Sequence, residues 1–304
     1  MDRQEIKSML ESIVGESGVK IDEPMNIHTT FKIGGVADYF VTPSSVDELQ
    51  SVITFLKKSD IVYFIIGNGS NLLVSDDGFR GVIIQLNDTF DGCEFIDDTT
   101  VEVMAGMLMS RLGNRLAKKG IGGFEFATGI PGTIGGAVRM NAGAYGGEMK
   151  DIVVSAKVLD SDCNLMEISA DKLEFGYRTS SIVKNNYTVV SVVLKLEKDE
   201  PDKIKARIKE LSVKRREKQP LEYPSAGSTF KRPEGNFAAK LIEDAGLKGA
   251  SVGGALVSTK HAGFVVNKGG ATAKDVCELT DRIKQEVMTK FGVKLELEVV
   301  KLGF

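Results

Sequence analysis

The segment Ile61–Ile66 (IVYFII) runs directly into Gly67–Leu73 (GNGSNLL), and this junction decides the fold class. A short, wholly apolar run is typical of a buried strand. Glycines that follow a strand let backbone N–H groups turn toward an anion such as a pyrophosphate, and Ser70 and Asn71 add side-chain donors. The loop is neither a Walker loop nor a Rossmann fingerprint, because their further residues are missing. A glycine hairpin turn is the simpler alternative.

A second glycine-rich span, Ala127–Gly147 (ATGIPGTIGGAVRMNAGAYGG), favours a ligand-binding loop over a simple hairpin turn. It holds seven glycines and is nearly free of charge. Such a span is too apolar for an ordinary exposed loop. It favours a backbone wall along a large, flat, partly apolar ligand, because glycine allows close approach of the backbone. Two glycine loops together favour a dinucleotide cofactor over a mononucleotide.

The composition of the 304-residue chain is that of an ordinary globular protein, with 42% hydrophobic and 27% charged residues. A net charge of -3 gives no indication of nucleic acid or of a membrane surface as partner. The three cysteines, Cys93, Cys163 and Cys277, are far apart, which indicates neither a disulfide framework nor a metal site. No apolar run approaches membrane-spanning length, and the N-terminal stretch lacks a signal-peptide core, so we expect a cytoplasmic protein.

Hydrophobic periodicity and turn residues predict a mixture of helices and strands in irregular order, which is an α+β fold. The helices are expected at residues 1–20, 47–58, 109–119, 201–217, 237–245 and 272–291. The strands are expected at residues 61–66, 82–86, 101–103, 153–159, 189–196 and 293–302. The charged helix 201–217 is a solvated connecting helix in this interpretation and a reasonable domain boundary.

The stretch Tyr223–Lys231 (YPSAGSTFK) presents Ser228 on a turn of small residues. The chain has only two histidines, His28 and His261, so the usual base that activates a nucleophilic serine is scarce. We therefore expect Ser228 to donate a proton rather than to attack. The alternatives are a turn or N-cap serine, or a serine hydrolase, which the missing Gly-x-Ser-x-Gly elbow disfavours.

The two glycine segments GNGSNLL and GIPGTIGGAVRMNAGAYGGEM resemble the FAD-binding domain of the vanillyl-alcohol-oxidase-like (PCMH-type) flavoproteins. The resemblance implies two α+β subdomains with the flavin between them, its diphosphate on the first loop and its ring near the second. It implies noncovalent FAD, because the only N-terminal histidine, His28, lies well before the loop. The implied cofactor-binding residues are Gly67, Asn68, Gly69, Ser70, Asn71, Leu72, Thr128, Gly129, Ile130, Pro131, Gly132, Gly135, Gly136, Asn141, Ala142 and Gly143.

Three more segments, Phe175–Ser180 (FGYRTS), the serine turn and Leu295–Val300 (LELEVV), look like the UDP-N-acetylenolpyruvoylglucosamine reductases. The resemblance covers residues 25 to 302. It implies that FAD is reduced by NADPH and then reduces the enolpyruvyl ether of UDP-N-acetylglucosamine-enolpyruvate to UDP-N-acetylmuramate. This reaction belongs to peptidoglycan precursor synthesis, and so to cell-wall biogenesis, cell shape and cell division. NADPH and the UDP-sugar would use one pocket in alternation.

The resemblance assigns catalysis to Arg178, Ser228 and Glu298. A permanently charged guanidinium suits the negative charge that builds on the substrate carboxylate, and a positioned hydroxyl suits protonation at C2 after hydride reaches C3. Alternation along a strand puts Glu296 and Glu298 on one face, so spacing does not choose between them, whereas the family pattern favours Glu298. An arginine in a surface ion pair and two solvated carboxylates are the plain alternatives.

The resemblance also assigns Tyr177, Lys231 and Arg232 to substrate binding. Only about ten residues separate Tyr177 from Val189, so the chain looks like the shorter subtype without a tyrosine-bearing loop. We expect an FAD-binding region at 1–200, with subdomains at about 20–85 and 86–200. The strand 293–304 is expected to return to that region, and a substrate-binding domain is expected at 201–292.

No metal is expected, and the protein is expected to be a monomer or weak oligomer. Two other functions stay open. A sugar or alcohol oxidase on the same fold would consume oxygen, and a non-catalytic nucleotide-binding module would bind without turnover.

Overall fold

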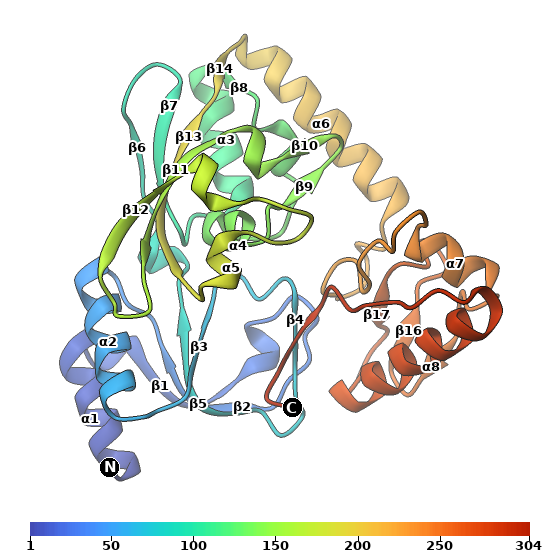
Figure 1. Ribbon diagram of the computed structural model, residues 1–304, viewed down its shortest axis with the longest axis horizontal. Helices are drawn as coiled ribbons and strands as arrows, with labels where there is room; N and C mark the ends of the chain where they lie inside the picture. The colour runs from blue at the N-terminus through green and yellow to red at the C-terminus, as the bar shows by residue number, and fades with distance from the viewer. The chain divides into compact units, whose positions relative to one another are not determined.

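The computed structural model describes residues 1–304 and divides the chain into two compact units (Figure 1). The first unit comprises residues 1–21, 39–68 and 81–214, and the second comprises residues 22–38, 69–80 and 215–304. Each unit has its own hydrophobic core. Neither unit is continuous in sequence, because the two short segments 22–38 and 69–80 join the C-terminal part of the chain. None of the helices has the length and apolar character needed to cross a membrane.

Two helices of the first unit, α1 (Arg3–Val14) and α2 (Val46–Lys58), begin after residues whose side chains cap them. In α2, the hydroxyl of Ser45 accepts the Glu48 N–H at 3.1 Å, and acidic and basic residues occupy the first and last turns. The helix expected at residues 1–20 ends at Val14, because Gly15 follows with φ 76° and β1 begins at Val19. The helices are α1 (Arg3–Val14), α2 (Val46–Lys58), α3 (Met109–Lys119), α4 (Ile134–Arg139), α5 (Ser181–Lys184) and most of α6 (Pro201–Lys218).

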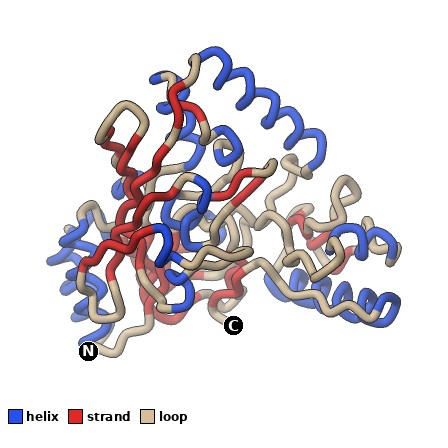
Figure 2. The backbone as a smooth tube through the Cα atoms, turned by 45° about the horizontal axis from the view of Figure 1, so that its top comes forward, coloured by secondary structure: helices blue, strands red, loops and turns tan.

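Two larger sheets are built from the N-terminal two thirds of the chain (Figure 2). A four-stranded sheet has the order β1-β2-β5-β3, and β3 pairs in parallel with β5 from Tyr63 opposite Val82 to Ile66 opposite Gln85. Its strands are β1 (Val19–Pro24), β2 (Val36–Val41), β3 (Tyr63–Ile66) and β5 (Phe79–Gln85). The apolar segment Ile61–Ile66 thus contains β3, and Gly67 follows directly after this strand.

The five-stranded sheet is antiparallel, with the order β12-β11-β13-β7-β6. Its strands are β6 (Cys93–Phe95), β7 (Thr100–Met104), β11 (Val153–Leu159), β12 (Leu165–Ser169) and β13 (Thr188–Lys195). Helix α4 packs on β13 and β7, so the sheet supports the second glycine-rich span (Figure 1). Short strands complete the unit: β8 (Ile121–Gly122) with β14 (Glu197–Lys198), and β9 (Gly143–Ala144) with β10 (Gly147–Glu148).

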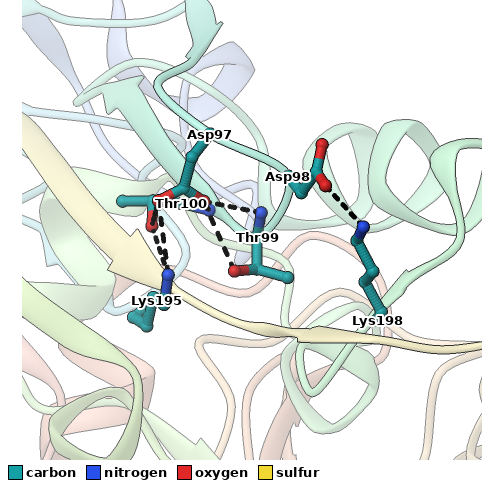
Figure 3. Close-up of polar contacts among 6 residues, drawn as sticks. All are labelled: Asp97, Asp98, Thr99, Thr100, Lys195 and Lys198. Carbon is teal, nitrogen blue, oxygen red and sulfur yellow. Dashed lines mark hydrogen bonds and ion pairs between the residues drawn. The ribbon is translucent and has the colours of Figure 1, made fainter.

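The turn between β6 and β7 is held by the carboxylate of Asp97 (Figure 3). It accepts the N–H groups of Thr99 and Thr100 at 2.8 and 2.7 Å and the ammonium of Lys195 at 3.3 Å. These bonds, led by that from the Thr99 N–H, hold the pKa of Asp97 far below its usual range. Lys198 binds Asp98 next to it. This cluster consists of mutually satisfied groups, and we assign it to turn stability.

The second unit packs α7 (Ala238–Asp244) and α8 (Ala273–Phe291) with an antiparallel sheet of order β15-β16-β17. These strands are β15 (Ser251–Val252), β16 (Ala255–Val257) and β17 (Val265–Asn267). Thr272 and Asp275 form a capping box at the start of α8. The carboxylate of Asp76 accepts the N–H groups of Ala273 and Lys274 at 2.7 and 3.0 Å, which ties residues 69–80 to the helix.

The strand expected at residues 293–302 is wrong over most of its length. Only β18 (Val300–Leu302) is a strand, and it pairs in parallel with β4 (Leu72–Val74). Upstream, Leu297 makes an isolated bridge with Phe230. Residues 296–298 form backbone hydrogen bonds with the serine turn. About three residues are too few for a strand ladder.

Candidate active site

The first glycine loop approaches the second glycine-rich span inside the first unit. A Cβ at Gly67 would overlap the Thr133 hydroxyl, so only glycine fits there. The amide Nδ2 of Asn68 donates to the Pro131 carbonyl at 2.7 Å, and the amide of Gln85 donates to the Gly67 carbonyl at 3.0 Å. The two loops, which are about 60 residues apart in the sequence, are thus in direct contact within this unit.

The second span is held from its far end by Asn141, whose side chain is buried and whose φ is 44°. Its Nδ2 donates to the Glu148 carboxylate at 3.0 Å and to the Gly176 carbonyl at 3.1 Å, while its Oδ1 accepts the Lys150 N–H at 3.0 Å. Asn141 uses both donor hydrogens and an acceptor inside the protein. It therefore shapes the wall, and any contact with a cofactor would come through its backbone.

Gly176 opens the tight turn that carries Tyr177 and Arg178. Gly176 and Thr179 form a bridge across the turn, and Arg178 has φ 56°. A left-handed conformation is uncommon for a residue with a side chain, and such strain concentrates at functional sites. The Arg178 guanidinium lies 5.2 Å from the centroid of the Tyr177 ring. The turn is thus fixed in a conformation that holds this cation over a neighbouring aromatic ring.

Glu148 is an acidic residue that interacts electrostatically with Arg178 of this turn. The pKa of Glu148 is lowered, first by its hydrogen bond with the Lys150 ammonium, then by that from Asn141, and also by the Coulomb attraction of Lys150 and Arg178. Burial opposes these effects. Glu148 therefore stays ionised and pairs with Lys150 at 2.8 Å, which leaves it suited to a structural role beside Arg178.

In the second unit, the rest of the first glycine loop lies against residues 28–30. Gly69 has φ 57°, and a Cβ there would overlap the His28 carbonyl oxygen. The Thr30 N–H donates to the Gly69 carbonyl at 3.4 Å. Leu72 is buried in β4, so it can offer a ligand only its backbone. His28 lies 2.7 Å from Glu23 through Nε2, and its role is that of an anchor for the loop.

Asn71 connects the glycine loop with the proposed catalytic glutamate. Its Nδ2 donates to the Glu298 carbonyl at 3.0 Å, and its own carbonyl accepts the Val300 N–H at 2.9 Å. The Glu298 N–H in turn donates to the Thr229 carbonyl at 2.9 Å, next to Ser228. Asn71, the serine turn and Glu298 are therefore neighbours in one backbone network of the second unit.

The serine turn is clamped on its other side by residues 263–266. Thr229 is buried, its N–H donates to the Gly263 carbonyl at 2.8 Å, and its hydroxyl accepts the Val265 N–H at 2.8 Å. Gly227 precedes with φ 76°. Ser228, which lies between Gly227 and Thr229, is half-buried. The backbone that carries its hydroxyl is therefore fixed by its neighbours.

Glu296 and Glu298, which the strand spacing does not distinguish, lie in different environments. Glu296 is exposed, and its carboxylate lies 3.5 Å from the Lys231 ammonium. Glu298 is half-buried, with its backbone bound to both Thr229 and Asn71. The environment therefore favours Glu298 as the residue of the site. Lys231 is fixed through its own N–H, which donates to the Glu296 carbonyl at 2.9 Å.

The structure thus divides the predicted site residues between the units. The first holds Tyr177, Arg178, Gly67, Asn68 and the residues from Thr128 to Gly143, and the second holds the residues from Gly69 to Leu72 with Ser228, Lys231, Arg232 and Glu298. Sequence reasoning missed two supports, Thr133 and Thr229. Thr133 follows Gly132 and Thr229 lies two residues after Gly227, and a small β-branched residue near a glycine is the only signal that pointed to them.

The described chain has no group of three His, Cys, Asp or Glu side chains placed to hold a metal ion, and its three cysteines are free. His261 is a structural residue: its Nδ1 accepts the Gly263 N–H at 3.1 Å, and its ring packs edge-on against Phe264.

Fold and site define a flavoprotein. The model of an FAD binding domain matches residues 37–169. At the level of fold alone, the 4-ethylphenol oxidase of Gulosibacter chungangensis is similar, with a TM-score of 0.51 and 14% identity over 64% of this chain and 42% of that one.

Closer comparisons narrow the class. The model of the C-terminal domain of UDP-N-acetylenolpyruvoylglucosamine reductase matches residues 219–302. The enzyme of that name from Clostridioides difficile strain 630 is 51% identical over 303 residues, covering 100% of this chain and 99% of the relative. The one from Clostridium tetani is 49% identical over 98% of this chain and 96% of the relative. The structure of the Thermus caldophilus enzyme aligns with a TM-score of 0.78 and 35% identity, covering 93% of this chain and 98% of that one. The chain belongs to the UDP-N-acetylenolpyruvoylglucosamine reductase family.

Proposed function

We propose that this FAD-dependent oxidoreductase uses NADPH to reduce UDP-N-acetylglucosamine-enolpyruvate to UDP-N-acetylmuramate, a step of peptidoglycan precursor synthesis. The observation that carries the proposal is the network that joins Asn71, the serine turn and Glu298. It puts the end of a predicted cofactor loop beside a predicted proton donor and a predicted catalytic carboxylate. Family membership supplies the substrate class.

The residues present fit FAD. A side chain at Gly67 or Gly69 would meet the Thr133 hydroxyl or the His28 carbonyl oxygen, so glycine lets the loop pack closely on its neighbours. In the second glycine-rich span Gly136 is exposed, so its backbone is open to a ligand. Backbone N–H groups of Gly69 to Asn71 would bind the diphosphate, and the wall from Thr128 to Gly143 would lie along the ring system. No histidine is placed there for a covalent link, which supports noncovalent binding.

The chain's own residues would act on the substrate at three points. FAD, when bound in its reduced form, would supply the hydride that the substrate accepts at C3. Arg178 would bind the substrate carboxylate and stabilise the negative charge that develops on it. Ser228 would give its hydroxyl proton to C2, and Glu298 would hold the geometry and charge of this site. Tyr177, Lys231 and Arg232 would orient the sugar nucleotide, with the two cations on its diphosphate.

The proposal is tested by separating the two half-reactions under anaerobic conditions. NADPH is added to the yellow protein until the flavin absorption is bleached, and the UDP-enolpyruvyl sugar is then added. We expect the yellow colour to return with formation of one UDP-N-acetylmuramate per flavin. A bleached enzyme that is reoxidised only by oxygen, and that oxidises an alcohol, would contradict the proposal and indicate an oxidase.

We further propose that residues 201–292 bind the substrate, and that the protein acts in the cytoplasm as a monomer or weak oligomer without nucleic acid or membrane as partner. The match of the C-terminal family domain to residues 219–302 supports the first point. Sedimentation velocity tests the oligomeric state: one species of about 33 kDa is expected from the chain mass of 32.9 kDa.

A further inference from the structure

Phe237 is an exposed aromatic residue close in sequence to the serine turn. The side chain is 60% exposed, although phenylalanine is among the residues most often buried. The guanidinium of Arg232 lies over its ring, 4.6 Å from the centroid. This exposed ring with a cation over it lies six residues beyond Lys231, a residue that we assign to the sugar nucleotide.

The backbone on both sides of this pair is fixed. The Lys231 N–H donates to the Glu296 carbonyl at 2.9 Å. The chain then reverses in the turn Pro233–Asn236, where the Asn236 N–H donates to the Pro233 carbonyl at 3.1 Å and Gly235 has φ 66°. Phe237 is the N-cap residue of α7, and its carbonyl accepts the Leu241 N–H at 3.1 Å. Arg232 and Phe237 are therefore held at the two ends of a rigid loop.

A guanidinium stacked on a phenyl ring makes a flat surface that is both apolar and cationic. Nucleobases stack on aromatic rings and on arginine planes, because both offer a π-face of matching size. A purely apolar ligand would make no favourable interaction with the arginine charge. A base attached to a diphosphate would interact with both the phenyl ring and the guanidinium. Lys231 and the N–H edge of Arg232 are the donors that we assign to the diphosphate, while the face of Arg232 lies against Phe237, so the base would lie beside the diphosphate on the same loop.

We propose that Arg232 and Phe237 form the platform on which the uracil of the sugar nucleotide stacks, with Phe237 as a binding residue for the nucleobase. The proposal rests on the function proposed above and adds a residue that the sequence argument did not name. It also gives the uridine end of the substrate a binding surface in a chain that lacks a tyrosine-bearing loop between Tyr177 and Val189.

Calorimetric titration of the FAD-loaded protein with UDP tests the platform. Phe237→Ala should weaken UDP binding by about 5- to 100-fold, the range that loss of one stacked base gives. Phe237→Leu keeps apolar bulk but not the π-face, and should lose a similar amount. Phe237→Tyr should bind within about twofold of the wild type. The matched control is Phe304→Ala, because Phe304 is also 60% exposed and carries the Lys301 ammonium at 4.0 Å from its ring centroid.

Kinetics give a second readout. Phe237→Ala should raise KM for the UDP-enolpyruvyl sugar while leaving kcat and the NADPH half-reaction within about twofold. UDP affinity equal to that of Phe304→Ala would overturn the proposal, and so would a loss confined to NADPH, which would put the adenine of that nucleotide on the ring. Failure of the parent function is a different result: the wild type itself would then neither bind UDP nor be reoxidised by the enolpyruvyl sugar.

Discussion

At the scale of single residues, the backbone that carries Ser228 is held in place by its neighbour Thr229. Thr229 is locked into the core by two hydrogen bonds, so the backbone beside Ser228 does not depend on the Ser228 hydroxyl. A substitution at Ser228 should therefore change chemistry without changing the fold.

We expect Ser228→Ala to leave reduction of the flavin by NADPH unchanged and to slow reoxidation by the enolpyruvyl substrate about 100- to 10,000-fold, the usual value of a positioned proton donor. Stopped-flow absorbance of each half-reaction measures this. Ser225→Ala is the control in the same turn. Equal losses in both half-reactions would show that Ser228 is structural.

The two glutamates give a second prediction, because only Glu298 is joined to both the serine turn and Asn71. Glu298→Gln should lower kcat by about 100-fold or more, as loss of one preorganised electrostatic contact does. Glu296→Gln removes an exposed ion pair with Lys231, which is worth little, so kcat should change less than about threefold. Steady-state assays of both variants decide this, and the reverse order would move the catalytic role to Glu296.

His261 gives a prediction on pH. Burial lowers its pKa from the ordinary value of 6.5, and its Nδ1 accepts a hydrogen bond, so the folded protein favours the neutral ring. On acidification the unfolded chain binds the proton first, so this stability is present above pH 6.5 and is lost as pH falls below it. The thermal midpoint of the wild type should fall more steeply between pH 7 and 5 than that of His261→Gln. Parallel curves would contradict the assignment.

At the scale of elements, sequence patterns predicted those helices whose ends carry their own signals. Helix α3 lies where expected because Gly120 ends it in a left-handed conformation, and α8 because Thr272 caps it. The strand at residues 293–302 was wrong because an extended segment becomes a strand only if a partner runs alongside, and that depends on distant residues. Asn71 and Glu298 are separated by 227 positions in the sequence. Their motifs therefore indicated the two residues but not the hydrogen bond between them.

The cap that Asp76 provides for α8 is a testable example of such a distant link. Asp76→Ala removes the acceptor of two helix N–H groups and should lower the free energy of unfolding by about 1–2 kcal/mol. Urea denaturation followed by circular dichroism measures the shift in midpoint. Asp77→Ala, at the exposed neighbouring position, should stay within about 0.5 kcal/mol. An equal effect of both substitutions would mean that the cap contributes nothing.

At the scale of the whole molecule, the second unit depends on the last residues of the chain. β18 pairs with β4, and Leu302 is buried. Removal of residues 300–304 deletes this pairing and exposes Leu72 and Leu73. The free energy of unfolding of the second unit should therefore fall by several kcal/mol, about the contribution of one buried leucine and its ladder hydrogen bonds. Limited proteolysis should then cleave at residues 215–304 first, while a chain shortened by Phe304 alone should resist as the wild type does.

The second unit also sets an order of events during synthesis. Two of its three segments, residues 22–38 and 69–80, leave the ribosome long before residues 215–304, which complete its core. Until then Phe31, Ile33 and Leu73 have no C-terminal partners. These apolar residues therefore lack their partners while more than a hundred intervening residues are made, which favours misassociation until the C-terminal segment is complete.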